Sequence, residues 1–447
     1  MSKKHASSQA AVESEWIPIE KILCLCFVLA KCLLLWKMWN QAVGFDWKPH
    51  IDMISTIRFT TFNTDIFATF YSYHPPFAFF IARLFFLMGT PIIGSVQLTS
   101  ALAIFISFFF LRATLRLLKL LTKPEGIAFL YIVYALPLNI FLSYSVNMDS
   151  VIFACTSGVL YYSIQMLMLK KNASFAHQLL TIVLTAVFVA AGLLTKFTGI
   201  LLLPIPLFVF FFLSKRIPYS QLWLPICSIV IALIFVFPYY SLRYYKTQGV
   251  WLPSNTNHFD AISQKQARAQ RDSDRIVFVT NLFGPTTVHK KGIQFRDLTT
   301  ARLADTWKDV WIMDQWLIDG SKIIVPLRAR IIGTVYLTLM PFLLLGGFAM
   351  HLWQLRKKNK NDVWQRFGLL LLSYSALLIL ALIFYIYKNP WAGSLANKAI
   401  YIAPATLGIG YLLAEYTRTK KSTHMSQILL FGLLVCMMIM SHLIPVY

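Results

Sequence analysis

The sequence predicts an all-α polytopic membrane protein with about eleven transmembrane helices and juxtamembrane helices in its first external loop. Of the 447 residues, 57% are hydrophobic and only 13% are charged, and the mean hydropathy is +0.63. Soluble globular proteins carry about 25% charged and about 45–50% apolar residues. The apolar residues also form runs of about 18–22, long enough to cross a hydrocarbon core of ~30 Å. These observations exclude a soluble multidomain enzyme, a disordered protein and a disulfide-rich secreted domain.

Short blocks of Lys and Arg between the apolar runs predict the orientation of the chain. The net charge is +23, and much of it lies in blocks such as 112–123, 356–360 and 418–421. Such blocks mark cytoplasmic loops, whereas a basic groove for nucleic acid would group its charges on one face. We therefore expect no nucleic-acid partner and a cytoplasmic amino terminus. The expected spans are about 22–40, 95–112, 126–145, 150–169, 177–195, 198–213, 219–240, 326–352, 365–387, 399–415 and 426–445.

Two long external loops separate these spans. The first, 41–94, contains an apolar run at 75–88 that is too short to span, so we expect a juxtamembrane helix with Pro75 and Pro76 in its first turn. The second, 241–325, is too long for a passive connection and contains an amphipathic pattern at 305–317. The chain is thus divided into a transmembrane module over 1–240, which includes the first external loop 41–94, a large external loop over 241–325, and carboxyl-terminal transmembrane helices over 326–447.

The first apolar run and the cysteines add little about compartment or cofactors. The first run lacks a small-residue cleavage site and is expected to be an uncleaved anchor. All six cysteines lie in apolar runs, where a thiol behaves as a small hydrophobe, and no Cys/His spacing is typical of a metal site. We therefore predict no cofactor, and nothing in the sequence indicates a divalent metal, although the residues present are compatible with one.

The acidic residues are few enough to place one by one. Of the 18 Asp and Glu, the topology puts six in the cytoplasm and the others outside. The external ones include Asp46 and Asp52 in the first loop, Asp149 at the end of a span, and eight residues of the large loop. Reactive carboxylates are therefore expected on the outer face.

Asp46 is the candidate for acid–base chemistry. It lies just beyond the first span between Phe45 and Trp47, and partial desolvation between bulky apolar residues raises the basicity of a carboxylate. Such a group can accept a proton from a hydroxyl nucleophile. The alternative interpretation is a solvated acid that pairs with Lys48 or His50.

Three other polar positions have two interpretations each. Asp149, after Asn147, is either a polar helix cap or a functional acid. Lys196, at the outer end of the fifth span, either extends toward the interface or binds a phosphate as a point charge. Lys31 lies near the middle of the first span, where a charge costs ~2.5–3.5 kcal/mol, and is expected to face other helices or extend toward the interface.

The motifs of the first loop, and the order in which they occur along the chain, resemble those of the GT-C class of integral-membrane glycosyltransferases. Within this class, the sequence resembles the polyprenyl-phosphate-sugar-dependent protein mannosyltransferases and the aminoarabinose-type lipid A transferases. The class has an acidic residue just past the first span, matched by Asp46, and several members have His or Tyr four residues later, matched by His50. Trp47 stands where those members have Glu, and the spacing of Asp52 differs from that of the missing acid. A His-Pro-Pro-apolar motif in the same loop is matched from His74 onward.

The later motifs of the class are also present. An external Asp after the third span is matched by Asp149, and a Thr-Lys pair after a later span is matched by Lys196 and the residue before it. Near the carboxyl end, a basic residue, an aromatic residue and a proline are matched by Lys398, Tyr401 and Pro404. The resemblance covers roughly residues 20–415.

The resemblance implies transfer of a sugar from a lipid-phosphate donor to a hydroxyl or similar acceptor on the non-cytoplasmic face. The leaving phosphate is already a good anion, so one base and a few cations suffice, in contrast to the two carboxyl groups of glycoside hydrolysis. The implied base is Asp46. The implied substrate-binding residues are Lys196, Arg243 and Lys398 for the phosphate, His74 and Asp149 for positioning, and His50, Asp52, Arg58 and Tyr401 as further candidates.

The implied partners are a polyprenyl-phosphate-linked sugar, a glycan, lipid or protein acceptor, and the lipid bilayer. The expected location is a bacterial plasma membrane, or the endoplasmic reticulum in a eukaryote. Two alternatives stay open: a transporter or flippase of lipid-linked sugars, and a non-catalytic assembly subunit. Transporters place ionisable groups near the midplane and show internal repeats, whereas nearly all acids here lie outside the apolar runs and no repeat is visible.

Overall fold

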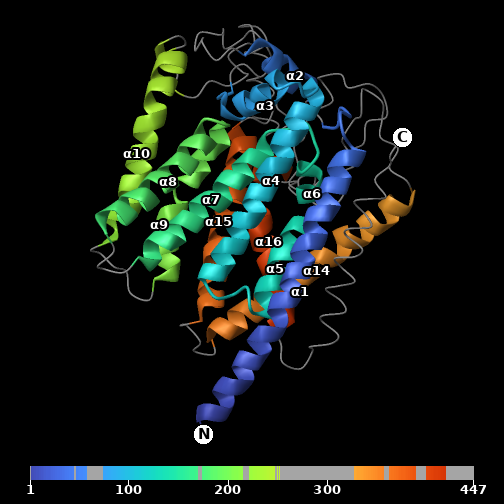
Figure 1. Ribbon diagram of the computed structural model, residues 1–447, viewed down its shortest axis with the longest axis vertical. Helices are drawn as coiled ribbons and strands as arrows, with labels where there is room; N and C mark the ends of the chain where they lie inside the picture. The colour runs from blue at the N-terminus through green and yellow to red at the C-terminus, as the bar shows by residue number, and fades with distance from the viewer. Residues whose placement is uncertain are drawn as a thin grey trace.

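The computed structural model describes residues 2–44, 47–57, 74–169, 174–214, 221–246, 249, 251, 327–356, 362–388 and 399–418. Within these ranges the chain is helical between its turns, and most of the long helices run side by side as a bundle (Figure 1). The predicted all-α architecture is therefore confirmed. Asp46, Arg58, Lys398, the side chain of Tyr401, the pattern at 305–317 and the last expected span lie outside the described residues.

The first four helices are two long helices that run along the bundle and two short ones between them in sequence. They are α1 (Ser2–Lys37), α2 (Trp47–Thr56), α3 (Phe77–Leu87) and α4 (Ile92–Leu117). We call the end that carries α2 and α3 the upper end (Figure 1). The expected juxtamembrane helix is α3, but it begins after Pro76, so the two prolines precede its first turn. Helices α1 and α4 pack together through Phe27, whose ring stacks on Phe108 at 4.1 Å between centroids.

Proline divides two of the expected spans. The run at 126–145 forms α5 (Pro124–Ala135) and α6 (Pro137–Leu142), because the residue before a proline is driven out of the helical conformation and Leu136 has ψ 133°. After α7 (Asp149–Met168) and α8 (Phe175–Leu193), the run at 198–213 begins as the 3-10 helix η1 (Phe197–Leu202) and continues as α9 (Ile205–Leu213). Pro204 lies at the break between them.

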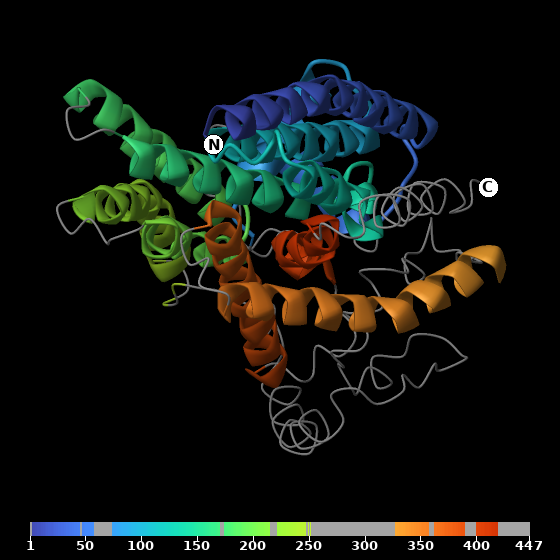
Figure 2. The ribbon, with the colours of Figure 1, turned by 90° about the horizontal axis from the view of Figure 1, so that it is seen from below.

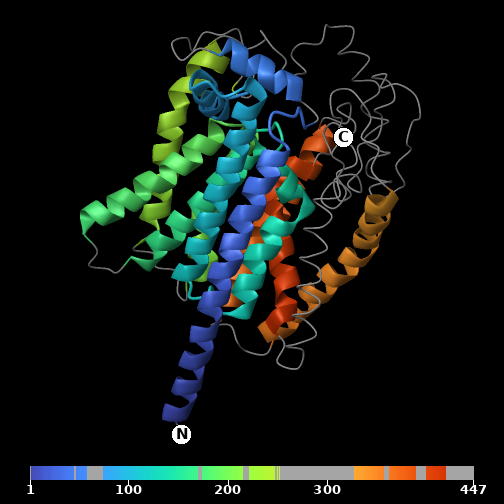
Figure 3. The same ribbon diagram turned by 45° about the vertical axis from the view of Figure 1, so that its right-hand side comes forward.

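The remaining helices complete the bundle. They are α10 (Trp223–Tyr240), which continues into the π-helical turn η3 (Ser241–Tyr245), α14 (Leu327–Arg356), α15 (Val363–Lys388), η7 (Ala399–Ala405), α16 (Thr406–Ala414) and η8 (Glu415–Arg418). Figure 2 shows α14 crossing α15 and running past α16, and in Figure 3 the amino-terminal end of α14, in orange, lies apart from the other helices.

Five helices of the described chain are long and apolar enough to cross a membrane: α4, α7, α8, α10 with η3, and α15. The total of eleven spans stays a prediction. Helix α7 is the most enclosed of the five, whereas α10 exposes Ile234, Phe235 and Phe237 by more than half. A bundle with a buried central helix and large exposed apolar side chains on a peripheral one is the arrangement of an integral membrane protein, in which lipid covers the peripheral face. Lys31, as expected, faces other helices: its Nζ lies 3.3 Å from Ser143 Oγ.

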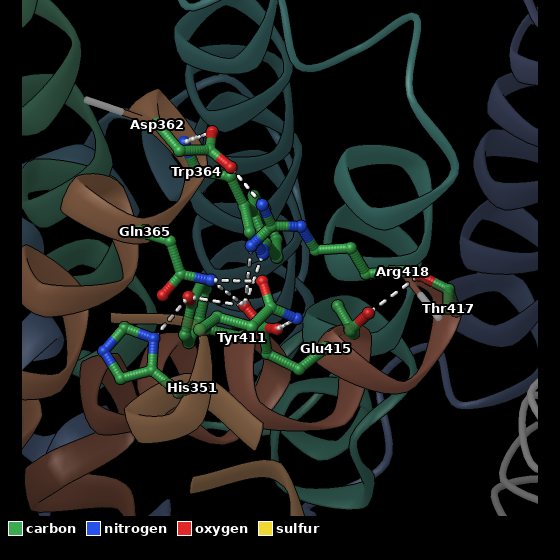
Figure 4. Close-up of polar contacts among 10 residues, drawn as sticks. His351, Asp362, Trp364, Gln365, Tyr411, Glu415, Thr417 and Arg418 are labelled. Atoms are coloured by element: carbon green, nitrogen blue, oxygen red, sulfur yellow. Dashed lines mark hydrogen bonds and ion pairs between the residues drawn. The ribbon is translucent and has the colours of Figure 1, made fainter. Parts of the chain in front are cut away.

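At the end of the bundle opposite to α2 and α3, the buried carboxylate of Glu415 in η8 joins α15 to α16 (Figure 3 and Figure 4). Glu415, with no exposed surface, accepts hydrogen bonds from Tyr411 Oη and Trp364 Nε1, each at 2.6 Å. Arg418 Nη1 lies 4.0 Å from the same oxygen, and Arg418 also pairs with Asp362. A buried charge is tolerated only when it is paired and hydrogen-bonded, and these contacts fasten the lower ends of α15 and α16 to each other.

Candidate functional site

Residues that the sequence predicts for the site come together at the upper end of the bundle. They arise from separate elements: α2, the residues before α3, the first residue of α7, the residue before η1, and the π-helical turn after α10. These positions hold His50, His74, Asp149, Lys196 and Arg243.

An ion pair between Asp149 and Lys196 is the centre of this region. Lys196 Nζ lies 2.8 Å from Asp149 Oδ1 and 3.1 Å from Oδ2, and the two side chains are 6% and 15% exposed for Asp149 and Lys196, respectively. Asp149 begins α7, where the helix dipole favours a negative charge, and its backbone N–H donates to Asn147 Oδ1 at 2.7 Å. Because the pair is largely shielded from water, removing either side chain would leave the charge of the other one uncompensated.

The end of α8 brings Lys196 to this position. A Cβ atom on Gly199 would lie 2.3 Å from the carbonyl of Gly192, so only glycine lets η1 pack this closely on the last turn of α8. Phe77 N donates to Leu194 O at 2.8 Å, which joins the start of α3 to the same turn. The Thr-Lys motif and the His-Pro-Pro motif are therefore neighbours in space, although they are about 120 residues apart.

His74 lies beside Lys196 and against the ring of Phe197, with centroids 6.1 Å apart. The pKa of His74 lies well below its ordinary value of 6.5, chiefly because the ring has lost its hydration, and further because of the positive charge of Lys196 and the proximity of His50. His74 is thus neutral near pH 7 and can act as a hydrogen-bonding group without adding charge to the site.

We expect this lowered pKa to make the fold less stable in mild acid. Below about pH 6.5 the unfolded chain binds a proton at His74 that the folded chain does not bind, so the free energy of unfolding falls as the pH drops from 6.5 toward the folded pKa. Above 6.5 the effect is absent. The measurement is the unfolding temperature of the purified protein between about pH 8 and pH 5. In His74→Gln the curve should be flatter than in the wild type below 6.5; parallel curves would contradict the assignment.

Arg243 occupies a π-helical turn with an aromatic wall. The guanidinium lies 5.8 Å from the ring centroid of Tyr239, and the residue is only 6% exposed. In the same turn, the ring of Tyr244 lies 5.8 Å from that of Phe197, next to the ion pair. Tyr240 Oη donates to a carbonyl at the end of α8 at 2.8 Å. Single π-helical turns are frequent at functional sites.

These aromatic residues are not among those predicted from the sequence. The signal was present in the run PYYSLRYY at 238–245, in which four tyrosines surround the predicted cation. Phe197, which follows Lys196 directly, carried no such signal, because its contact with Tyr244 depends on how η1 packs against η3.

Asp52, a further predicted residue that the structure describes, is not part of this contact network. Asp52 lies half-buried on α2, and its backbone carbonyl accepts hydrogen bonds from Ser55 and Thr56. No contact found in the described ranges joins its carboxylate to Asp149 or Lys196. Among the residues that the structure describes, no group of three or more His, Cys, Asp and Glu is placed to hold a metal ion.

The arrangement provides one neutralised pair, a further cation and a neutral imidazole at one end of a membrane bundle. Lys196 and Arg243 are the cations, Asp149 the acid and His74 the imidazole. Such a group has an excess of positive charge in a shielded environment, which suits an anion that carries hydrogen-bonding groups, such as a sugar phosphate.

Comparisons with known proteins agree with the resemblance drawn from the motifs. Residues 73–241 match the model of the family described as dolichyl-phosphate-mannose-protein mannosyltransferase, and this segment contains His74, Asp149 and Lys196. The resemblance to the GT-C class is confirmed. No curated protein matches the chain.

Two crystal structures of ArnT from Cupriavidus metallidurans resemble the chain at low identity. One is the apo state, with 13% identity over 93% of this chain and 79% of that one; the other is bound to undecaprenyl phosphate, with 15% identity over 93% and 80%. The TM-score is 0.39 in both comparisons. Similarity at this level defines neither a site nor a substrate for the chain described above.

Proposed function

We propose that the protein is a membrane glycosyltransferase that moves a sugar from a polyprenyl-phosphate donor to an acceptor hydroxyl on the non-cytoplasmic face, with Asp46 as the general base. The observation that carries the proposal is the shielded group of Asp149, Lys196 and His74 within a segment that matches a mannosyltransferase family, with Arg243 two residues beyond the end of that segment. The first-loop segment that continues to Asp46 starts at the same end of the bundle.

The chemistry divides between one base and several cations. As the acceptor oxygen attacks the anomeric carbon, its proton passes to Asp46, and the bond to the phosphate oxygen breaks with its electron pair remaining on the phosphate. Negative charge therefore builds on the leaving group, where preorganised cations stabilise the transition state most. Lys196 and Arg243 have this role, and Lys398 is a third candidate from the sequence. A phosphate is a good leaving group, so no general acid is needed.

The remaining candidates position the reactants. Asp149 holds the ammonium group of Lys196 in one place. Neutral His74 beside it donates a hydrogen bond to the sugar or the phosphate, or accepts one from a sugar hydroxyl. His50 and Asp52 on α2, together with Arg58 and Tyr401, complete the set of proposed substrate-binding residues. The basic residues near the opposite end, among them Arg112 and Arg418, support an assignment of the site to the non-cytoplasmic side.

The proposal is tested by donor consumption. Purified protein in vesicles is incubated with a panel of polyprenyl phosphates that carry radiolabelled hexoses or pentoses, together with a membrane extract as the source of acceptors. We expect one donor to be consumed, with label in an acceptor and an equal amount of free polyprenyl phosphate. Movement of intact donor across the bilayer, without release of polyprenyl phosphate, would establish a transporter and contradict the proposal.

A further inference from the structure

Gln97 on α4 makes three hydrogen bonds to the turn that ends α1. The residue has no exposed surface. Its Oε1 accepts from Asn40 N at 2.7 Å, and its Nε2 donates to Met38 O at 2.8 Å and to Gln41 O at 3.0 Å. The last carbonyl groups of a helix have no intrahelical partner, and Asn40 turns the chain with φ +58°. One side chain therefore determines the direction in which the chain leaves α1.

Ser100, one helical turn further along α4, holds a second segment. It is also fully buried, and its Oγ donates to Asn147 O at 2.7 Å. The side chain of Asn147 in turn accepts the backbone N–H of Asp149 at 2.7 Å. The same face of α4 thus binds the turn after α1 and the turn before α7.

The two held segments also contact each other. Val146 N donates to Val43 O at 2.7 Å. Gly44 has φ +140°, a conformation that favours glycine, and a Cβ atom there would lie 3.1 Å from the carbonyl oxygen of Val146. Asp46 follows Gly44 by two positions and α2 begins at Trp47. These contacts therefore hold the backbone as far as Gly44, two residues before Asp46 in the sequence.

We propose that Gln97 and Ser100 are positioning residues for sugar transfer: they hold the segment leading to Asp46 in a fixed register against the segment leading to Asp149. This inference rests on the proposed function, because it assigns a role relative to the base. Neither residue touches the reacting atoms. Their effect arises because a displacement of ~1 Å in a catalytic group can lower a rate by about 10²-fold.

Stability alone does not explain the arrangement. A helix end can satisfy its last carbonyl groups through a tighter last turn or through a backbone cap, and apolar side chains can fill the space beside α4. Instead, the amide group of Gln97 makes all three of its hydrogen bonds to the turn after α1, and Ser100 makes a hydrogen bond to the turn before α7. Such a set of bonds specifies a single backbone geometry where a packed apolar contact would leave several.

The test compares buried polar residues of the same helix. Gln97→Met keeps the length of the side chain and removes its hydrogen bonds, and Ser100→Ala removes one bond. The matched control is Ser107→Ala: Ser107 is equally buried on α4, but its Oγ bonds to Tyr134 and Ser157, away from both turns. For each variant we measure kcat and the KM for the polyprenyl-phosphate sugar, together with the unfolding temperature.

We expect kcat to fall about 10²-fold in Gln97→Met and less in Ser100→Ala, with the donor KM changed less than about twofold, while Ser107→Ala keeps the wild-type kcat. Equal loss of kcat in Ser100→Ala and Ser107→Ala at equal unfolding temperatures would overturn the proposal, and so would a wild-type kcat in both Gln97→Met and Ser100→Ala. In either case, a loss of transfer in Asp46→Asn would leave the proposed function intact. Full activity of Asp46→Asn would overturn the assignment of Asp46 as the base, whereas the function itself is tested by donor consumption in the wild type.

Discussion

Replacing Asp46 by Asn is expected to lower the rate of sugar transfer by about 10²–10⁴-fold. The amide has nearly the same size as the carboxylate but cannot take a proton from the attacking hydroxyl. Because the cations of the phosphate site are unchanged, we expect the donor to bind as in the wild type. The measurements are the initial transfer rate at saturating donor and the retention of a labelled polyprenyl-phosphate sugar by the purified protein.

Asp65→Asn is the matched control for this variant. Asp65 belongs to the same first loop and has no role in the proposed site, and the control makes the same change from Asp to Asn. It should retain wild-type transfer. If Asp46→Asn transfers sugar at the wild-type rate while present at the normal level in the membrane, Asp46 is not the base and the proposed chemistry is wrong.

The helical architecture could be predicted because hydrophobic length is a strong local signal. The runs at 95–112, 150–169 and 177–195 became α4, α7 and α8 with ends shifted by a few residues. The run at 126–145 predicts one span, because its hydrophobicity outweighs a weaker signal within it, Pro137. In the structure α5 ends at Ala135, two residues before this proline, and α6 begins at the proline.

For the candidate site, the distribution of charge along the sequence could predict only on which side of the membrane each residue lies. The basic blocks placed Asp149 and Lys196 on the same side, but nothing in the sequence indicated that their side chains meet, because the contact depends on how closely η1 approaches the end of α8. Gln97 was missed for a related reason. A single glutamine in an apolar run has no pattern of its own, and its partners are backbone groups 56 to 59 residues earlier in the chain.

Separating the ion pair should affect stability and transfer in different ways. Lys196→Met removes the charge but keeps the length of the side chain, so Asp149 is left as a largely buried, uncompensated carboxylate. We expect this variant to lose about 3 kcal/mol of unfolding free energy, the scale seen when one partner of a buried pair is removed. Asp149→Asn leaves the ammonium group of Lys196 without this partner. We expect a smaller loss of unfolding free energy than in Lys196→Met, because Lys196 is the more solvent-accessible of the two residues.

The double variant Asp149→Asn with Lys196→Met separates the structural role from the catalytic one. With both charges gone, no unpaired charge is buried, so the free energy of unfolding should return most of the way to the wild-type value, and a double-mutant cycle gives the coupling between the two groups. Transfer should stay low, because the cation proposed to hold the donor phosphate is still missing. Recovery of transfer together with stability would show that Lys196 serves only the fold. A double variant as unstable as Lys196→Met would show that the loss arises from packing of the lysine stem and not from the unpaired acid.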